Sequence, residues 1–209
     1  DLDGDGLPDI YLGNDYSAPD YVYKNLGKGK FREELSQSVS HTSLYTMGID
    51  FGDINGDGLQ DLVTLDMLPE DSKRQKLLFS PENYEHHNLF LDVGLHSQHM
   101  RNMLQLNQGS GKFVEIGEFS GVAKTDWSWT PLLADFDLDG NLDLIVTNGF
   151  LKDFTNLDFI NYRENFFKSE KPSQQAISEL IARMPATPLS NYAYRNQGDL
   201  SFENVSKLW

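Results

Sequence analysis

Short apolar segments recur along the chain and are separated by polar turns that contain glycine. Asp9-Ile-Tyr-Leu12, Asp61-Leu-Val-Thr64 and Asp143-Leu-Ile-Val146 each place aliphatic and β-branched residues side by side. Segments of this length and composition suit a buried strand better than a helix. Further strand-like apolar segments, residues 46–52 and 129–134, precede the second and third of them. The pattern therefore predicts pairs of strands, repeated along the sequence.

A second pattern follows each pair: an apolar residue, an Asn, a turn with glycine and then a Phe. It occurs in residues 23–31, 104–113 and 194–202. This order is typical of a β-hairpin with a tight loop. Each unit thus contains about four strands, and recurring units of four antiparallel strands are typical of propeller blades.

We therefore predict an all-β fold, a partial β-propeller of about three four-stranded blades. The predicted units are residues 1–45, 46–120 and 121–209. Because propellers contain roughly four to eight blades, we expect the chain to be part of a longer protein, with the rest of the propeller missing.

Two insertions interrupt the second and third units, at residues 69–100 and 153–186, where the period-two pattern is lost. The second contains a predicted helix that Ser173 can cap and Pro185 ends. Its Ile177, Leu180, Ile181 and Met184 are expected on one face. Both insertions follow the same strand of their units, so we expect them on one side of the propeller, where long loops commonly build binding surfaces.

The connection between the first two strands of each unit has the pattern D-x-[DN]-x-D-G-x-x-D. Oxygen ligands at positions 1, 3, 5 and 9, with a backbone carbonyl at position 7, suit calcium, which takes six to eight oxygens. Glycine at position 6 permits the sharp turn. An EF-hand would need Glu at position 12, where this chain has Leu12, Thr64 and Val146.

The sequence therefore predicts three calcium ions in loops between strands. The predicted ligands are Asp1, Asp3, Asp5, Leu7 and Asp9; Asp53, Asn55, Asp57, Leu59 and Asp61; and Asp135, Asp137, Asp139, Asn141 and Asp143. The favoured role is stabilisation of each blade, because the loop joins two strands and the protein fills all five positions. The alternative is a site that a carboxylate of a partner completes.

Composition supports this interpretation. The formal charge is −15, and the loops hold four, three and four of the 32 acidic residues. Three calcium ions would bring the charge to about −9, so the acidity is largely a property of the metal sites and argues against nucleic-acid binding. The chain has no cysteine, so calcium rather than disulfides is expected to fasten the fold. That suits a calcium-rich, extracytoplasmic setting.

The loops and hairpins together resemble the FG-GAP or VCBS repeat, which also forms the calcium-binding blades of integrin α-subunits. Four segments, residues 64–76, 101–107, 125–129 and 147–156, are similar to Bacteroidetes repeat proteins that pair such blades with an ASPIC/UnbV domain, the cartilage acidic protein type. The resemblance implies a secreted or surface-anchored protein with a role in adhesion or nutrient capture. Anchoring to a membrane would then lie in the N-terminal part of the parent protein.

Other residues were candidates for chemistry. His86, His87, His96 and His99 lie in the first insertion, but only His96-x-x-His99 has the spacing of a zinc ligand pair, so surface or packed histidines are favoured over a zinc site. No nucleophile or phosphate-binding pattern indicates catalysis. We therefore predict a non-catalytic module that binds a protein or glycan. The alternatives are part of a polysaccharide-active enzyme and a structural spacer.

Two further groups of residues are ambiguous in the sequence. A polar residue stands five positions beyond the last ligand of each loop, either to cap the strand end or to line one mouth of the propeller: Asn14, Asp66 and Asn148. Aromatic residues of the strands are expected to pack inside or between blades: Tyr11, Tyr23, Phe31, Trp127 and Trp129. Aromatic residues of the connections could contact a ligand or pack under the loops: Tyr16, Tyr84, Phe150 and Phe154.

Overall fold

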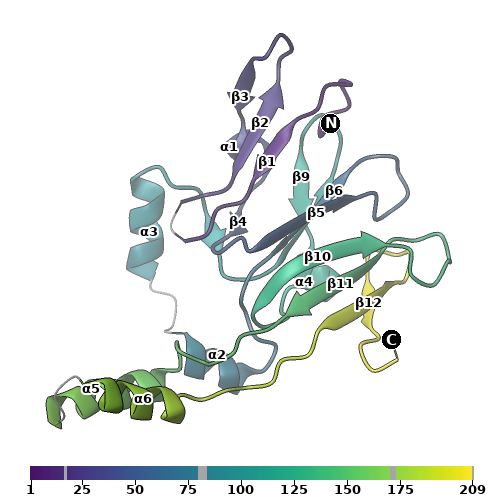
Figure 1. Cartoon of the computed structure of the whole chain (residues 1–209). Helices are drawn as coiled ribbons and strands as arrows, with labels where there is room; N and C mark the ends of the chain where they lie inside the picture. Colours follow the sequence, from purple (N-terminus) through teal and green to yellow (C-terminus); the bar gives the residue numbers. More distant parts are fainter. Residues whose placement is uncertain (17, 80–83, 170–172, 209) are drawn as a thin grey trace.

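The computed structural model describes residues 1–16, 18–79, 84–169 and 173–208. Three antiparallel sheets follow one another in a row and form the framework, as the strand pattern predicted (Figure 1). The first sheet has the order β1 (Ile10–Leu12), β2 (Tyr21–Asn25) and β3 (Phe31–Glu33). The second has the order β5 (Gly48–Gly52), β6 (Asp61–Leu65), β8 (Met103–Asn107) and β9 (Phe113–Glu115). The third has the order β10 (Ser128–Ala134), β11 (Asp143–Asn148), β12 (Tyr192–Asn196) and β13 (Phe202–Asn204).

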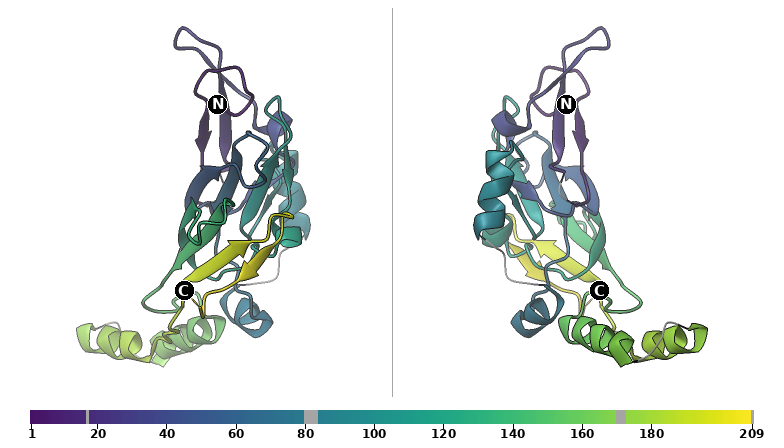
Figure 2. Two further views of the ribbon diagram at one scale, coloured as in Figure 1. Left: turned by 90° about the vertical axis from the view of Figure 1, so that its right-hand side faces the viewer. Right: turned by 90° about the vertical axis from the view of Figure 1, so that its left-hand side faces the viewer.

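The first sheet has three strands, whereas the other two have four. The nine-residue segments that carry the predicted calcium ligands, residues 1–9, 53–61 and 135–143, are called the metal loops below. The other two sheets repeat one order: a strand, the loop, a second strand, an insertion and a hairpin. In both side views the sheets are again stacked in sequence order (Figure 2).

The two central strands of the middle sheet, β6 and β8, are buried on both faces. All five residues of β6 are buried, and alternate side chains face opposite neighbours. Leu62 packs with Leu2 and Val22 of the first unit, whereas Val63 and Leu65 belong to the cluster shared with the third sheet. This explains why the consecutive residues Leu62 and Val63 are both apolar, instead of alternating with polar residues.

Close approach between sheets depends on glycine. A Cβ added to Gly48 of β5 would lie 2.1 Å from the carbonyl oxygen of Trp129, at the start of β10. At the other end of β5, a Cβ on Gly52 would lie 2.7 Å from a methyl group of Leu142. The β5 backbone therefore lies against the backbone of β10 at Gly48 and against a leucine side chain of the third unit at Gly52. Asp50 adds a polar link, since its Oδ2 accepts a hydrogen bond of 2.8 Å from the N–H of Leu133.

Both insertions are helical, as expected. The first contains α2 (Ser72–Leu78) and α3 (Tyr84–Asp92), and the second contains α5 (Leu157–Ser169) and α6 (Gln174–Arg183). In Figure 1, α2, α5 and α6 lie together at the lower end of the molecule, and α2 contacts α5. The metal loops lie on the other side of the row of sheets. α2 of the first insertion and both helices of the second thus share one side, as predicted, whereas α3 lies apart from them in Figure 1.

The helix predicted after Ser173 is α6, and its cap is confirmed: the Ser173 hydroxyl accepts a hydrogen bond of 3.1 Å from the N–H of Ala176. The prediction of its buried face is only partly right. Leu180 and Ala176 are buried, but Ile177 and Ile181 are 46% and 51% exposed. The helix lies at the edge of the molecule, where only one side of its apolar stripe finds a partner.

Some short elements were not predicted. A single helical turn follows two of the hairpins, α1 (Leu35–Ser38) and α4 (Gly117–Ser120). Two short segments pair in parallel, β4 (Thr42–Ser43) and β7 (Gln98–His99). β7 lies inside the first insertion, so this pairing ties the insertion back to the connection between the first two sheets.

Candidate metal centres

The loop carboxylate at position 1 is held by backbone N–H groups of its own loop. In the first loop, Asp1 accepts hydrogen bonds from Gly4, Asp5 and Gly6 at 2.8, 3.1 and 2.9 Å. In the other two loops the N–H groups of positions 5 and 6 make the same bonds to Asp53 and to Asp135, at 2.8–3.1 Å. The loops therefore fold alike, and their glycines at position 6 have φ of 83°, 86° and 96°, values that favour glycine.

The carboxylate at position 9 connects the loop to the hairpin of the same sheet. Asp9 accepts one hydrogen bond from Leu2, at 2.7 Å, and one from the N–H of Asn25, at 2.8 Å. Asp61 and Asp143 repeat both bonds with the residue at position 2 and with the hairpin Asn of their units, at 2.8–3.0 Å. Position 9 thus fixes the hairpin relative to the loop in every unit.

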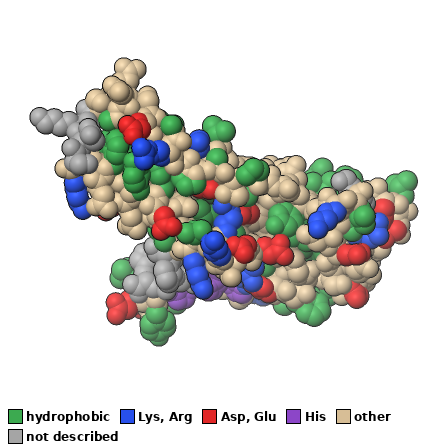
Figure 3. Space-filling model, turned by 90° about the horizontal axis from the view of Figure 1, so that it is seen from below, with side chains coloured by type: hydrophobic (Ala, Val, Ile, Leu, Met, Phe, Trp, Pro, Cys, Tyr) green, Lys and Arg blue, Asp and Glu red, His purple; other side chains and the backbone are tan. Residues whose placement is uncertain are grey.

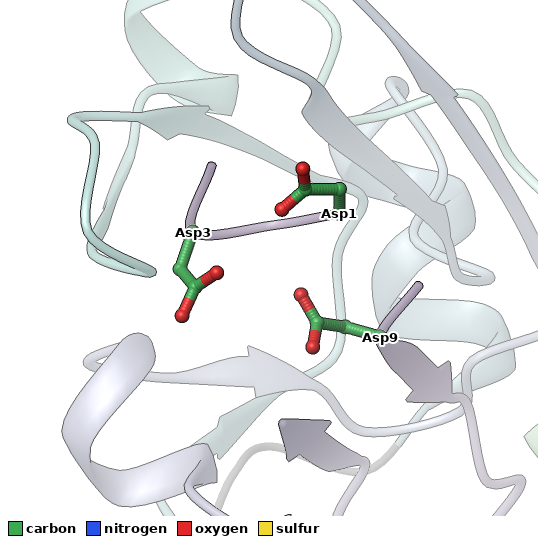
Figure 4. Close-up of side chains that lie close together, drawn as sticks. All are labelled: Asp1, Asp3 and Asp9. Atoms are coloured by element: carbon green, nitrogen blue, oxygen red, sulfur yellow. The ribbon is translucent and has the colours of Figure 1, made fainter. Parts of the chain in front are cut away.

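Carboxylates converge in two loops. Oxygen atoms of Asp1, Asp3 and Asp9 all lie within 4.8 Å of one another, and their side chains face a common centre (Figure 4). Asp135, Asp137 and Asp143 form the same group in the third loop. In the second loop the residue at position 3 is an amide, Asn55, so positions 1, 3 and 9 of this loop carry two carboxylates, Asp53 and Asp61.

The position 5 carboxylates are not part of these groups. Each accepts a hydrogen bond of 2.8–2.9 Å from the N–H of position 7: Asp5 from Leu7, Asp57 from Leu59, and Asp139 from Asn141. In the first and third loops the structure thus brings the carboxylates of positions 1, 3 and 9 together and places position 5 beside them. An oxygen-only donor set of this kind fits a hard cation such as calcium; that the loops bind it stays a prediction.

In the second loop a buried carboxylate, Asp61, lies near two other carboxylates. Burial raises the pKa of Asp61 above its ordinary value, although hydrogen bonds from Asn107 and Ile54 lower it, and the nearby Asp57 and Asp53 raise it further. A cation in this loop would offset both the cost of burying the Asp61 carboxylate and its repulsion by the other two carboxylates.

The hairpin Asn, which recurs in all three units, connects neighbouring units, a role that the sequence pattern did not predict. Asn107 donates through its side-chain N–H to the carbonyl of Gln60, within its own unit, and to that of Leu2 in the first loop, both at 3.0 Å. Asn196 repeats this, with bonds to Leu142 and to Ile54 of the second loop, at 3.1 and 2.9 Å. Each hairpin Asn therefore ties its sheet to the metal loop of the preceding unit.

The polar residues beyond the loops cap strand ends, as the favoured interpretation predicted. Asn148 donates to the carbonyls of Thr125 and Ser190. Asp66 is fully buried and accepts backbone N–H bonds from Leu44 and Tyr45, at 2.9 and 3.0 Å. Burial raises the pKa of Asp66 to about 8 against the effect of these N–H groups. Such a buried carboxyl does not face an open mouth.

The histidines form a packed cluster that includes one residue from outside the insertion. The rings of His87 and His41 contact His99 with centroids 5.6 and 5.3 Å away. His41 also lies 3.4 Å from Glu115. Burial alone would raise the pKa of Glu115, but hydrogen bonds from His41 and Arg101 outweigh that effect and lower the pKa to about 2. The side chain of His86 lies outside the described residues, and among those described no group of histidines converges as the loop carboxylates do.

Aromatic residues behaved differently from the prediction in two places. Trp127 is buried, but Phe31 and Trp129, expected to pack inside or between blades, are 44% and 41% exposed, and both stand on edge strands, β3 and β10. Phe150 stacks on Trp127 with ring centroids 4.4 Å apart, and Phe154 packs against both. These two connection residues therefore pack under the second insertion. The other two, Tyr16 and Tyr84, are 70% and 77% exposed.

A buried ion-pair network joins the two insertions. Arg74 of α2 contacts Asp126 at 2.5 Å and Asp153 at 3.0 Å, and donates to Thr187 at 2.9 Å. Thr187 in turn donates to Asp153 at 2.6 Å. The Arg74 side chain is 15% exposed and the two carboxylates are 10% and 5% exposed. The network holds α2 against both ends of the second insertion.

Repeated four-stranded units with loops of one geometry define a β-propeller-like repeat protein. More specifically, the FG-GAP-like repeat model matches residues 1–64 and 90–146, more than half of the chain, which therefore belongs to that family. The matched segments leave out α2, α5 and α6. None of the curated protein sequences matches the chain. Among the described helices, none has the length and apolar character that a membrane span requires.

Proposed function

We propose that the chain is a non-catalytic, calcium-binding segment of a β-propeller, with three blades and one calcium ion in each metal loop. The observation that carries the proposal is the repetition: all three loops have carboxylates at positions 1, 5 and 9, and in each the position 1 carboxylate accepts the same hydrogen bond from the N–H of position 6. Residues at positions 1, 3 and 9 would hold the ion, with position 5 beside them. The ion would supply the positive charge that the loop lacks.

The location of the loops supports a structural role for calcium. Each loop joins two strands of a sheet through position 9, and the hairpin Asn of the following unit bonds to the loop backbone. An ion that orders the loop would therefore stabilise both the sheet and its packing on the next one. Because metal binding to the folded state is linked to folding, calcium should raise the melting temperature.

The insertion side is the proposed binding surface for a protein or glycan outside the cell. FG-GAP repeats are typically adhesion or ligand-binding modules of extracellular proteins, and the family model does not include most of the insertions. Seen from below, this side carries separate apolar patches with acidic and basic side chains between them (Figure 3). Such a mixed surface suits specific recognition better than burial in a permanent core.

Calorimetry with calcium and with EDTA tests the metal proposal. Calcium should raise the melting temperature, by an amount that falls in the variant Asp53→Asn, because that loop loses one of the carboxylates that would hold the ion. The matched control is Asp92→Asn on the exposed side of α3, which should keep the full response. An unchanged melting temperature in the unsubstituted protein would remove calcium from the proposal. On the same sample, a glycan panel tests the second part: turnover of a glycan contradicts a non-catalytic module.

A further inference from the structure

Basic residues reach the metal loop in two of the three units. Arg195, directly before the hairpin Asn of the third unit, places Nε 2.8 Å from Oδ2 of Asp137 at position 3. In the first unit, Lys24 stands at the same place and its ammonium contacts Asp3 at position 3 and lies 3.6 Å from Asp5. Neither contact is fully solvated, since the Asp3 and Asp137 side chains are 8% and 23% exposed.

The second unit differs at both positions together. Leu106, a buried residue, stands where the other units have Lys24 and Arg195, and position 3 is the neutral Asn55. The first and third loops thus combine four carboxylates with one cation, whereas the second has three carboxylates and no cation at that place. The formal charge of these groups is therefore −3 in each of the three loops.

Resting on the proposed calcium binding, we propose that Lys24 and Arg195 are built-in counter-cations that set the calcium affinity of their loops. Without calcium, each neutralises the surplus carboxylate and keeps the loop folded. With calcium, the same positive charge stands next to a divalent ion and weakens its binding by Coulomb repulsion. The matched net charge would let all three loops fill over a similar range of calcium concentration.

The two effects are linked by one thermodynamic cycle. If removal of the cation destabilises the calcium-free fold but leaves the calcium-bound fold unchanged, the affinity must rise by the same free energy. Replacing Lys24 or Arg195 by Met should therefore lower the melting temperature in EDTA. It should also tighten calcium binding at that loop by about tenfold, the order expected for one unit charge at short range near the surface.

Each loop can be followed separately by NMR through the amides of Gly6, Gly58 and Gly140, which donate to the position 1 carboxylates. With calcium buffered by a chelator, Lys24→Met should shift the titration of Gly6 alone. Likewise, Arg195→Met should shift that of Gly140 alone.

Charge-conserving and distant variants complete the design. Lys24→Arg and Arg195→Lys should restore the original affinity, whereas Lys30→Met and Arg163→Met, at exposed positions, should leave all three titrations unchanged. Unaltered calcium affinity in both Met variants, with calcium bound by the unsubstituted protein, overturns the counter-cation proposal alone. Glycine amides that never respond to calcium in the unsubstituted protein overturn the calcium proposal and this one together.

Discussion

Position 4 of the metal loops requires a left-handed backbone. It is glycine in the first two loops, with φ of 79° at Gly4 and 73° at Gly56, but leucine in the third, with φ of 63° at Leu138. A residue with a Cβ pays about 1–2 kcal/mol for this conformation. The Leu138 side chain is 86% exposed, so no packing offsets the cost.

Replacing Leu138 by glycine should therefore stabilise the protein. The expected gain is about 0.5–1 kcal/mol, the relief of strain less the extra chain entropy of glycine in the unfolded state. Thermal unfolding in EDTA measures it. Leu151→Gly is the matched control, because Leu151 is 85% exposed and does not have positive φ. That substitution should give no gain, and an equal gain in both variants would contradict the explanation.

Residues of the loops could be predicted from sequence because their geometry is local. Nine consecutive positions contain the turn glycine and all the proposed ligands, so spacing alone identifies them. Partners from other parts of the unit could not be predicted in the same way. Asn196 lies 53 residues from Asp143, and Arg195 lies a similar distance from Asp137. Their contacts depend on the hairpin folding back onto the loop, and the strand pattern does not fix that position.

At the scale of elements, the hairpins carry the contact between units. The hairpin Asn of the second and third units bonds both to its own loop and to the preceding one. Among the described residues, the partners of the Asn25 side chain are Pro8, at 2.9 Å, and Gly27, both in its own unit. The sequence predicted the hairpins themselves, since their turn glycines and alternating residues are local signals. The order of strands within a sheet could be predicted from the hairpins. The hydrogen bond from each hairpin Asn to the preceding unit could not.

Asn107→Ala should accordingly cost more stability than Asn25→Ala. Asn107 is 1% exposed, and its loss leaves the buried carbonyls of Leu2 and Gln60 without that donor, for an expected cost of about 2–3 kcal/mol. The same change at Asn25 removes one exposed donated bond, to Pro8, and should cost about 1 kcal/mol. The bond that each Asn accepts from its turn glycine is lost in both variants. Urea unfolding of the two variants gives the comparison. Equal costs would show that the bond between units adds nothing.

At the scale of the whole molecule, the placement of the insertions depends on contacts between distant parts of the chain. Arg74 meets Asp126, Asp153 and Thr187, which lie 52, 79 and 113 residues away in sequence. The sequence predicted that both insertions would share one side, because they follow equivalent strands. It gave no sign that one arginine would join them, since no spacing rule relates residues in two separate loops.

Arg74→Met should loosen the insertion side while leaving the sheets intact. Removing the cation leaves Asp126 and Asp153 buried without their shared partner, which should cost about 3 kcal/mol. Hydrogen exchange should speed up in α2 and α5 but not in β6, whose five residues are all buried in the middle sheet. Arg74→Lys should give exchange rates between those of the unsubstituted protein and of Arg74→Met, because an ammonium keeps the charge but cannot reproduce the forked contacts of a guanidinium. The matched control is Lys73→Met, an exposed neighbour on the same helix with the same change of charge. If both Met variants have the same small effect, the network does not hold the insertions in place, and the proposed binding surface must be ordered by apolar packing such as that of Phe150 on Trp127.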